Sequence, residues 1–116
     1  MKKILVTGAN GFIGTNLFSK LLILTDKFEL HALSRNSNGP LDKLGKIHKV
    51  DFIDNKKVKE IIDNIKPNIV IHLACSKYRI MEGTNLLSDY FLNLNLSLNI
   101  IESVRNLPEL EKFIFF

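Results

Sequence analysis

Short apolar runs alternate along the chain with segments of helical periodicity. Ile4-Leu5-Val6 is a compact apolar run that stops at glycine, which is typical of a strand buried on both faces. Similar runs predict four more strands, at residues 28–33, 47–50, 69–74 and 112–116. The chain therefore contains enough strand segments for one sheet.

Helical spacing of apolar residues fills the stretches between these runs. From Phe12 onward the apolar positions are Phe12, Ile13, Leu17, Leu21, Leu22 and Leu24. A second helix carries Val58, Ile61, Ile62 and Ile65, with Asp54 and Asn55 as candidate caps. Pro67 ends this helix, because proline disfavours helical geometry in the residue before it. A third, long helix is predicted over roughly residues 86–104, whereas residues 36–40 and 82–85 are predicted as loops.

Strands that alternate with helices predict crossover units and a parallel sheet, hence an α/β fold. At 116 residues, and without a linker or repeat, the chain is expected to form a single domain over residues 1–116. Its net charge of +4 comes from scattered lysines that form no basic face, which argues against a nucleic-acid partner.

Localisation follows from cysteine content and hydropathy. Cys75 is the only cysteine, so the chain can form neither an intrachain disulfide nor a thiolate zinc cluster, which fits a reducing cytoplasm. The apolar run at residues 4–6 is too short for a signal peptide, and no run approaches the roughly 18 residues of a membrane helix. We expect a soluble, cytoplasmic protein without a membrane partner.

Three glycines at intervals of three, Gly8, Gly11 and Gly14, separate the first strand from the first helix. Gly8 permits a sharp exit from the strand. Gly11 lets the backbone approach a pyrophosphate, and Gly14 lets the helix pack tightly on the sheet. The helix N-terminus adds unpaired N–H groups and a partial positive charge. This context predicts a dinucleotide phosphate site rather than a simple turn.

The spacing also points to a family. Residues 7–14, Thr-Gly-Ala-Asn-Gly-Phe-Ile-Gly, resemble the extended short-chain dehydrogenases, the branch of NAD(P)-dependent nucleotide-sugar epimerases, dehydratases and reductases. The resemblance implies a Rossmann-like, doubly wound parallel sheet of five strands in the order 3-2-1-4-5. It also implies that Asn10, Phe12 and Ile13 join the three glycines at the cofactor.

Further stretches match the family in the expected order. Asp51 and Phe52 resemble the pair that contacts the adenine, and Leu73 and Ala74 resemble the end of the fourth strand beside the cofactor. Asn93 resembles the family's structural asparagine on the long helix. Cys75 follows the fourth strand, and we interpret it as a packing residue at the cofactor rather than a nucleophile, since no cation lies near it in sequence to lower its pKa.

The residues after the second strand bear on the choice of cofactor. An acid there usually holds the ribose 2′-hydroxyl of NAD, but this chain has Ser34 and Arg35. A guanidinium binds a 2′-phosphate in bidentate fashion, and a carboxylate would repel it. The sequence therefore favours NADP(H) over NAD(H), unless Arg35 is merely a solvated loop residue.

The catalytic residues that the resemblance implies, a serine and a Tyr-x-x-x-Lys pair, have no match here. Neither Tyr78 nor Tyr90 has a lysine four residues later. We expect these residues, and the substrate domain, to lie beyond Phe116, so that the 116 residues alone have no turnover. The chain then represents the N-terminal part of an enzyme acting on a nucleotide sugar. The alternative is a non-catalytic NAD(P)-binding structural or sensory module.

Two expectations concern contacts. We expect self-association through the 86–104 helix, which resembles the family's dimer helix, or through an exposed apolar edge at residues 112–116. His72, inside an apolar strand, is interpreted as buried and hydrogen-bonded rather than as an acid–base residue. Asn99, on the long helix, either orders the neighbouring backbone or is simply a polar surface residue.

Overall fold

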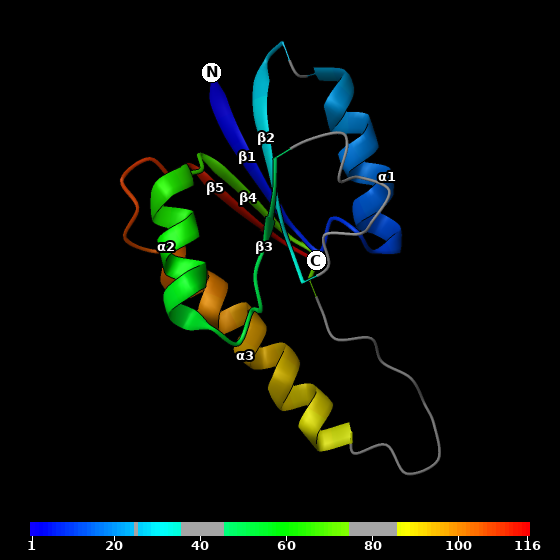
Figure 1. Cartoon of the computed structure of the whole chain (residues 1–116), viewed down its shortest axis with the longest axis vertical. Helices are drawn as coiled ribbons and strands as arrows, with labels where there is room; N and C mark the ends of the chain where they lie inside the picture. The colour runs from blue at the N-terminus through cyan, green and yellow to red at the C-terminus, as the bar shows by residue number, and fades with distance from the viewer. Residues whose placement is uncertain (25, 36–45, 75–85) are drawn as a thin grey trace.

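Five parallel strands form a single sheet in the order β3-β2-β1-β4-β5, as predicted (Figure 1). The structure is a computed structural model that describes residues 1–24, 26–35, 46–74 and 86–116. The strands are β1 (Lys2–Thr7), β2 (Phe28–Ser34), β3 (Lys46–Lys49), β4 (Ile69–His72) and β5 (Lys112–Phe115). Because the chain runs outward from β1 to β3 and then returns to β4, the direction of winding reverses between β1 and β4.

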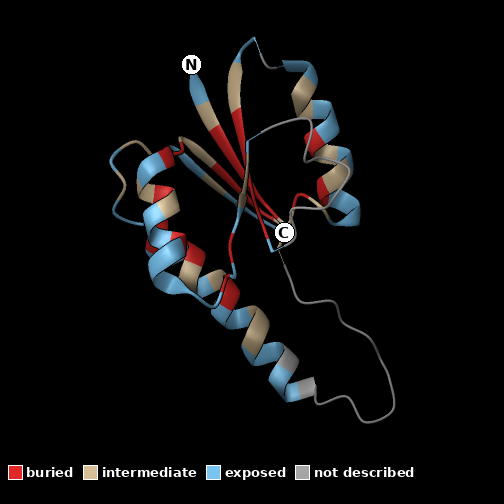
Figure 2. Ribbon diagram, viewed as in Figure 1, coloured by how far each residue is buried: buried red, intermediate tan, exposed pale blue. Residues whose placement is uncertain are grey.

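Helices cover both faces of this sheet. α1 (Phe12–Leu21) lies on one face and continues into the short 3₁₀ helix η1 (Leu22–Leu24), whereas α2 (Asn55–Ile65) and α3 (Leu86–Val104) lie on the other (Figure 1). Neighbouring residues of β1 point to opposite faces: Leu5 packs in the core under α2 and α3, and Val6 packs in the core under α1. The central strands are accordingly buried on both sides (Figure 2).

The buried face of α1 includes a residue outside the apolar series that the sequence shows. Phe18 is fully buried, whereas Phe12 and Ile13 are 87% and 58% exposed. Gly14 is also buried and lies four residues before Phe18, so the two share one face of the helix. The missing side chain at Gly14 lets this face approach the turn before the helix, and the rotation that results turns Phe12 and Ile13 towards solvent.

The ends of α2 follow the sequence signals. Asp54 is the N-cap, and its carboxylate accepts a hydrogen bond from the N–H of Lys57, while Asn55 is the first helical residue. Lys66 ends the helix in the left-handed conformation with φ of 55°. Pro67 follows directly, in agreement with the rule that the residue before proline avoids helical geometry.

β4 is shorter than the predicted strand over residues 69–74, because it ends at His72. The N–H of Leu73 still donates to the carbonyl of Thr7 at 3.1 Å, and the N–H groups of Leu73 and Ala74 both donate to Oγ1 of Thr7, at 3.2 Å each, where the strand ends. The loops predicted at residues 36–40 and 82–85 lie outside the described residues. In the described parts of the chain, no helix combines the length and apolar character that a membrane crossing requires.

Candidate functional site

A tight turn joins β1 to α1 at the carboxyl edge of the sheet. The N–H of Gly8 donates to the carbonyl of Leu33 at the end of β2, and the N–H of Gly11 donates to the carbonyl of Gly8 at 3.1 Å. The N–H of Thr15 then donates to the carbonyl of Gly11 as α1 begins. The turn thus lies at the point where the winding of the sheet reverses, where open α/β sheets bind their ligands.

Two of the three glycines are required by close packing. Gly8 has φ of 75°, and a Cβ on it would lie 2.7 Å from the backbone nitrogen of Ala74. A Cβ on Gly14 would lie 2.1 Å from the carbonyl oxygen of Gly8, so α1 packs on the turn itself. At Gly11 an added Cβ would meet that same oxygen at 3.3 Å, and Gly11 is exposed. Gly11 therefore leaves an open approach to the backbone.

The first turn of α1 presents unpaired donors at this approach. Its N-cap, Gly11, has no side chain to accept from the N–H groups, and no acid lies in the first turn of the helix. The first N–H groups of any helix lack intrahelical acceptors, and they carry the positive end of the helix dipole. The exposed side chains of Phe12 and Ile13 flank them. This arrangement suits a phosphate or pyrophosphate.

A buried polar network supports the turn from below. Oγ1 of Thr7 accepts two N–H groups, from Leu73 and Ala74, so its own hydrogen is left for Nδ1 of His72 at 2.7 Å. Nε2 of His72 then carries the ring proton and donates to Oγ of Ser97 on α3, at 3.0 Å. Burial lowers the pKa of His72, in agreement with a neutral ring. The prediction that His72 is buried and hydrogen-bonded is confirmed.

The end of β2 lies beside the same turn. Nδ2 of Asn10 donates to Oγ of Ser34 at 3.0 Å, which ties the turn to the residue that closes β2. Ser34 is buried, whereas Arg35, which follows it, is exposed. The structure thus brings Asn10, Ser34 and Arg35 to one edge, with the guanidinium open to a ligand.

The remaining predicted residues are more dispersed. Leu73 and Ala74 follow β4 and contact Gly8 through the backbone. Asp51 is exposed and Phe52 buried just beyond β3, at the same edge but on the far side of β2. Asn93 is half-buried on α3. Cys75 lies outside the described residues.

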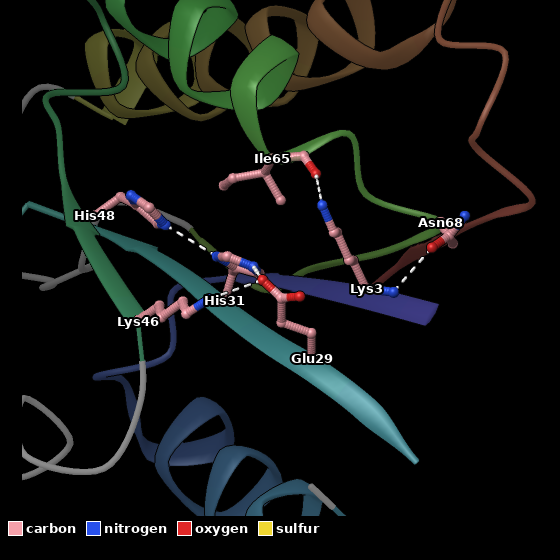
Figure 3. A network of polar contacts seen from close by, with 7 residues as sticks. All are labelled: Lys3, Glu29, His31, Lys46, His48, Ile65 and Asn68. Atoms are coloured by element: carbon pink, nitrogen blue, oxygen red, sulfur yellow. Dashed lines mark hydrogen bonds and ion pairs between the residues drawn. The ribbon is translucent and has the colours of Figure 1, made fainter. Parts of the chain in front are cut away.

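A second polar cluster, absent from our sequence predictions, lies on the sheet face towards α2 (Figure 3). Oε1 of Glu29 accepts from Nε2 of His31 at 2.8 Å and from Nζ of Lys46 at 2.9 Å. Because Nε2 of His31 donates to the carboxylate, Nδ1 of a neutral His31 accepts from Nε2 of His48, at 3.0 Å. The only sequence signal was the parity of these positions: Glu29 and His31 share one face of β2, and Lys46 and His48 share one face of β3.

Electrostatics differ within this cluster. The hydrogen bond from Lys46, followed by that from His31, lowers the pKa of Glu29 to about 2. Burial lowers the pKa of His31 despite the opposing effect of Glu29, and burial also lowers the pKa of His48. The cluster joins β2 to the edge strand β3, and it lies on the face of the sheet opposite to α1.

Comparison with known proteins places the chain in a family. The model of the NAD dependent epimerase/dehydratase family matches residues 4–116. UDP-glucose 4-epimerase of Mycoplasma genitalium is 29% identical, over 97% of this chain and 35% of its own length. L-threonine dehydrogenase of Clostridium difficile is 32% identical with a TM-score of 0.81, over 99% of this chain and 36% of its own.

A third relative was solved with its cofactor. UDP-glucose 4-epimerase of Thermus thermophilus, in complex with NAD, is 26% identical with a TM-score of 0.73, over 89% of this chain and 33% of its own. The chain therefore spans about a third of the length of these three relatives.

Proposed function

Because the chain belongs to the NAD-dependent epimerase/dehydratase family, we propose that it binds a nicotinamide dinucleotide across the carboxyl edge of its sheet. The pyrophosphate lies on the turn of residues 8–14. The adenine lies towards Asp51 and Phe52, and the nicotinamide half extends past Leu73, Ala74 and the region of Cys75 and Asn93. The single observation that carries this proposal is the helix N-terminus that Gly11 leaves open.

The same proposal includes a preference for NADP(H) over NAD(H). The exposed guanidinium of Arg35 follows Ser34 at the end of β2, and the hydrogen bond from Asn10 to Ser34 connects this position to the phosphate turn. An NADP 2′-phosphate here gains a bidentate cationic partner, and no carboxylate follows β2 at residues 34 and 35 to repel it. The Thermus relative was solved with NAD, so the preference is a proposal about this chain alone.

Titration calorimetry with both cofactors tests the proposal. We expect NADP⁺ to bind more tightly than NAD⁺, and Arg35→Ala to weaken NADP⁺ about tenfold, the cost of roughly 1.5 kcal/mol for a charge-assisted hydrogen bond. NAD⁺ affinity is expected to stay unchanged. Arg105→Ala is the matched control, since Arg105 is exposed and paired with Glu102 on α3. Tighter binding of NAD⁺ by the unmodified chain would refute the preference.

We further propose that the protein to which these residues belong transfers hydride to or from a nucleotide-activated sugar, since two of the three relatives are UDP-glucose 4-epimerases. The third relative is an L-threonine dehydrogenase, so the proposed sugar substrate rests on the two epimerases. A serine followed about a dozen residues later by Tyr-x-x-x-Lys, in sequence after Phe116, supports the enzyme. A stop codon there favours a non-catalytic NAD(P)-binding module.

Finally, we propose that copies of the chain associate in the cytoplasm through α3 or through β5. On α3, an exposed apolar stripe comprises Leu87, Tyr90, Phe91, Leu94, Leu98 and Ile101. Ile114, Phe115 and Phe116 form an exposed apolar edge at β5, while Phe113 packs against the core. Both surfaces are apolar enough to favour burial against a second copy.

A further inference from the structure

Asn99 on α3 makes a hydrogen bond to a distant part of the chain. Its side-chain Nδ2 donates to the carbonyl oxygen of Phe52 at 2.8 Å, across 47 positions of sequence. A carbonyl only accepts, so the amide nitrogen must face it. The Phe52 side chain is itself 3% exposed, in the core under α2 and α3. The position of Phe52 is therefore fixed twice, by the hydrogen bond from Asn99 to its carbonyl and by the burial of its side chain.

The segment around Phe52 is otherwise shaped by local hydrogen bonds. Oδ1 of Asp51 accepts from the N–H of Ile53 at 3.1 Å, and the carbonyl of Asp51 accepts from the N–H of Asp54 at 2.9 Å. Asp54 in turn caps α2. These local bonds define the shape of the turn between β3 and α2, but they do not determine where the turn lies relative to α3.

We infer that Asn99 is a positioning residue for the adenine end of the dinucleotide, an inference that rests on the proposed function. By holding the Phe52 carbonyl, it sets the backbone from which the exposed carboxylate of Asp51 projects. One oxygen of that carboxylate is engaged with Ile53, and its other oxygen remains to accept from the exocyclic amine of an adenine. Asn99 contacts neither the ligand nor Asp51 in this arrangement, and it acts through Phe52.

Two ligands separate this role from a general effect on the fold. ADP-ribose carries the adenine, whereas nicotinamide mononucleotide has a phosphate and the nicotinamide but no adenine. We expect Asn99→Ala to reduce the affinity for ADP-ribose about 3- to 10-fold, the range for one lost hydrogen bond. The affinity for the mononucleotide should stay unchanged. Asn95→Ala, an exposed asparagine one turn earlier on α3, is expected to change neither.

A double-mutant cycle adds a readout that a purely structural role would not move. If Asn99 acts through the Asp51 segment, the double variant Asn99→Ala with Asp51→Ala should lose no more affinity for ADP-ribose than Asp51→Ala alone. Additive losses would overturn the inference, as would an equal loss for both ligands. Asn99→Asp keeps the size and removes the donor, and it replaces Asn99→Ala if that variant does not fold.

Failure of the proposed function is distinguishable in the same experiment. If the unmodified chain binds none of NADP⁺, NAD⁺ and ADP-ribose, the proposed function falls, and the inference falls with it. If the unmodified chain binds ADP-ribose and Asn99→Ala binds it equally well, only the inference falls.

Discussion

At the scale of single residues, the three glycines of the turn have different roles despite their regular spacing. Gly8 and Gly14 are surrounded by backbone that a methyl group would overlap, whereas a methyl group on Gly11 would meet only the carbonyl oxygen of Gly8, at 3.3 Å. The motif therefore combines two glycines required by packing with a third, exposed glycine to which we assign the proposed phosphate contact. The role of Gly11 at the phosphate stays a prediction, whereas Gly14, expected to pack on the sheet, packs against the turn.

Alanine substitutions should separate these roles. We expect Gly14→Ala to reduce the free energy of unfolding by about 3 kcal/mol, because its Cβ would overlap the Gly8 carbonyl. Gly11→Ala should reduce the free energy of unfolding by only about 1 kcal/mol. It should nevertheless reduce the affinity for the dinucleotide about tenfold or more, because its methyl group would obstruct the phosphate. Urea unfolding and calorimetry measure the two effects. Wild-type affinity in Gly11→Ala would contradict the assignment of the phosphate site.

At the scale of elements, polar side chains connect strands that the hydrophobic pattern treats only as buried. One network links β1, β4 and α3 through Thr7, His72 and Ser97. The other links β2 to β3 and consists of Glu29, His31, Lys46 and His48 (Figure 3). If a histidine is neutral in the folded chain, the free energy of unfolding falls at any pH at which the same histidine is protonated in the unfolded chain. We therefore expect the free energy of unfolding to depend on pH through these networks.

The sign of this dependence follows from the pKa shifts. All three histidines have pKa values below the usual value of about 6.5 in the folded chain, so the unfolded chain binds protons first. We expect the free energy of unfolding to be greatest above about pH 6.5 and to fall as the pH is lowered below it. Glu29, with a pKa of about 2 instead of 4.5, adds a separate loss below about pH 4.5.

Urea unfolding between pH 8 and pH 3 measures both declines, and two variants assign them. His48→Gln should reduce the decline that begins near pH 6.5. Glu29→Gln should remove the one at lower pH and preserve the upper one, since it takes away the group that raises the pKa of His31. Constant stability between pH 7.5 and pH 5.5 would show that the histidines are not held neutral.

At the scale of the whole molecule, two apolar surfaces are exposed, one on the outer side of α3 and one at the carboxyl end of β5, where Phe115 lies beside His72. Leu94 is 53% exposed near the middle of the α3 stripe, and Phe115 is 62% exposed on β5. The inner side of α3 contributes Leu96, Ile100 and Val104 to the core of the described residues. The outer stripe is exposed, and it is one of the two surfaces to which we assign the proposed association.

Sedimentation velocity distinguishes the two surfaces. We expect the unmodified chain to associate at high concentration, and Leu94→Glu or Phe115→Glu to weaken association by tenfold or more, depending on which surface pairs, since a buried unpaired carboxylate is costly. Ile23→Glu is the control, because Ile23 is 76% exposed and belongs to neither surface. A monomeric unmodified chain at high concentration would refute self-association.

Local patterns in the sequence determined the elements of this protein, their parallel arrangement and the turn at residues 8–14, because periodicity and glycine spacing are short-range properties. The order of the strands followed from the resemblance to a family. The sequence did not reveal that Phe18 rather than Phe12 faces the core, since a helix's rotation depends on what it packs against. Nor did it reveal the tie from Asn99 to Phe52 or the pairing of His31 with His48. These contacts join residues far apart in the chain, and only the tertiary structure decides which distant donors and acceptors meet.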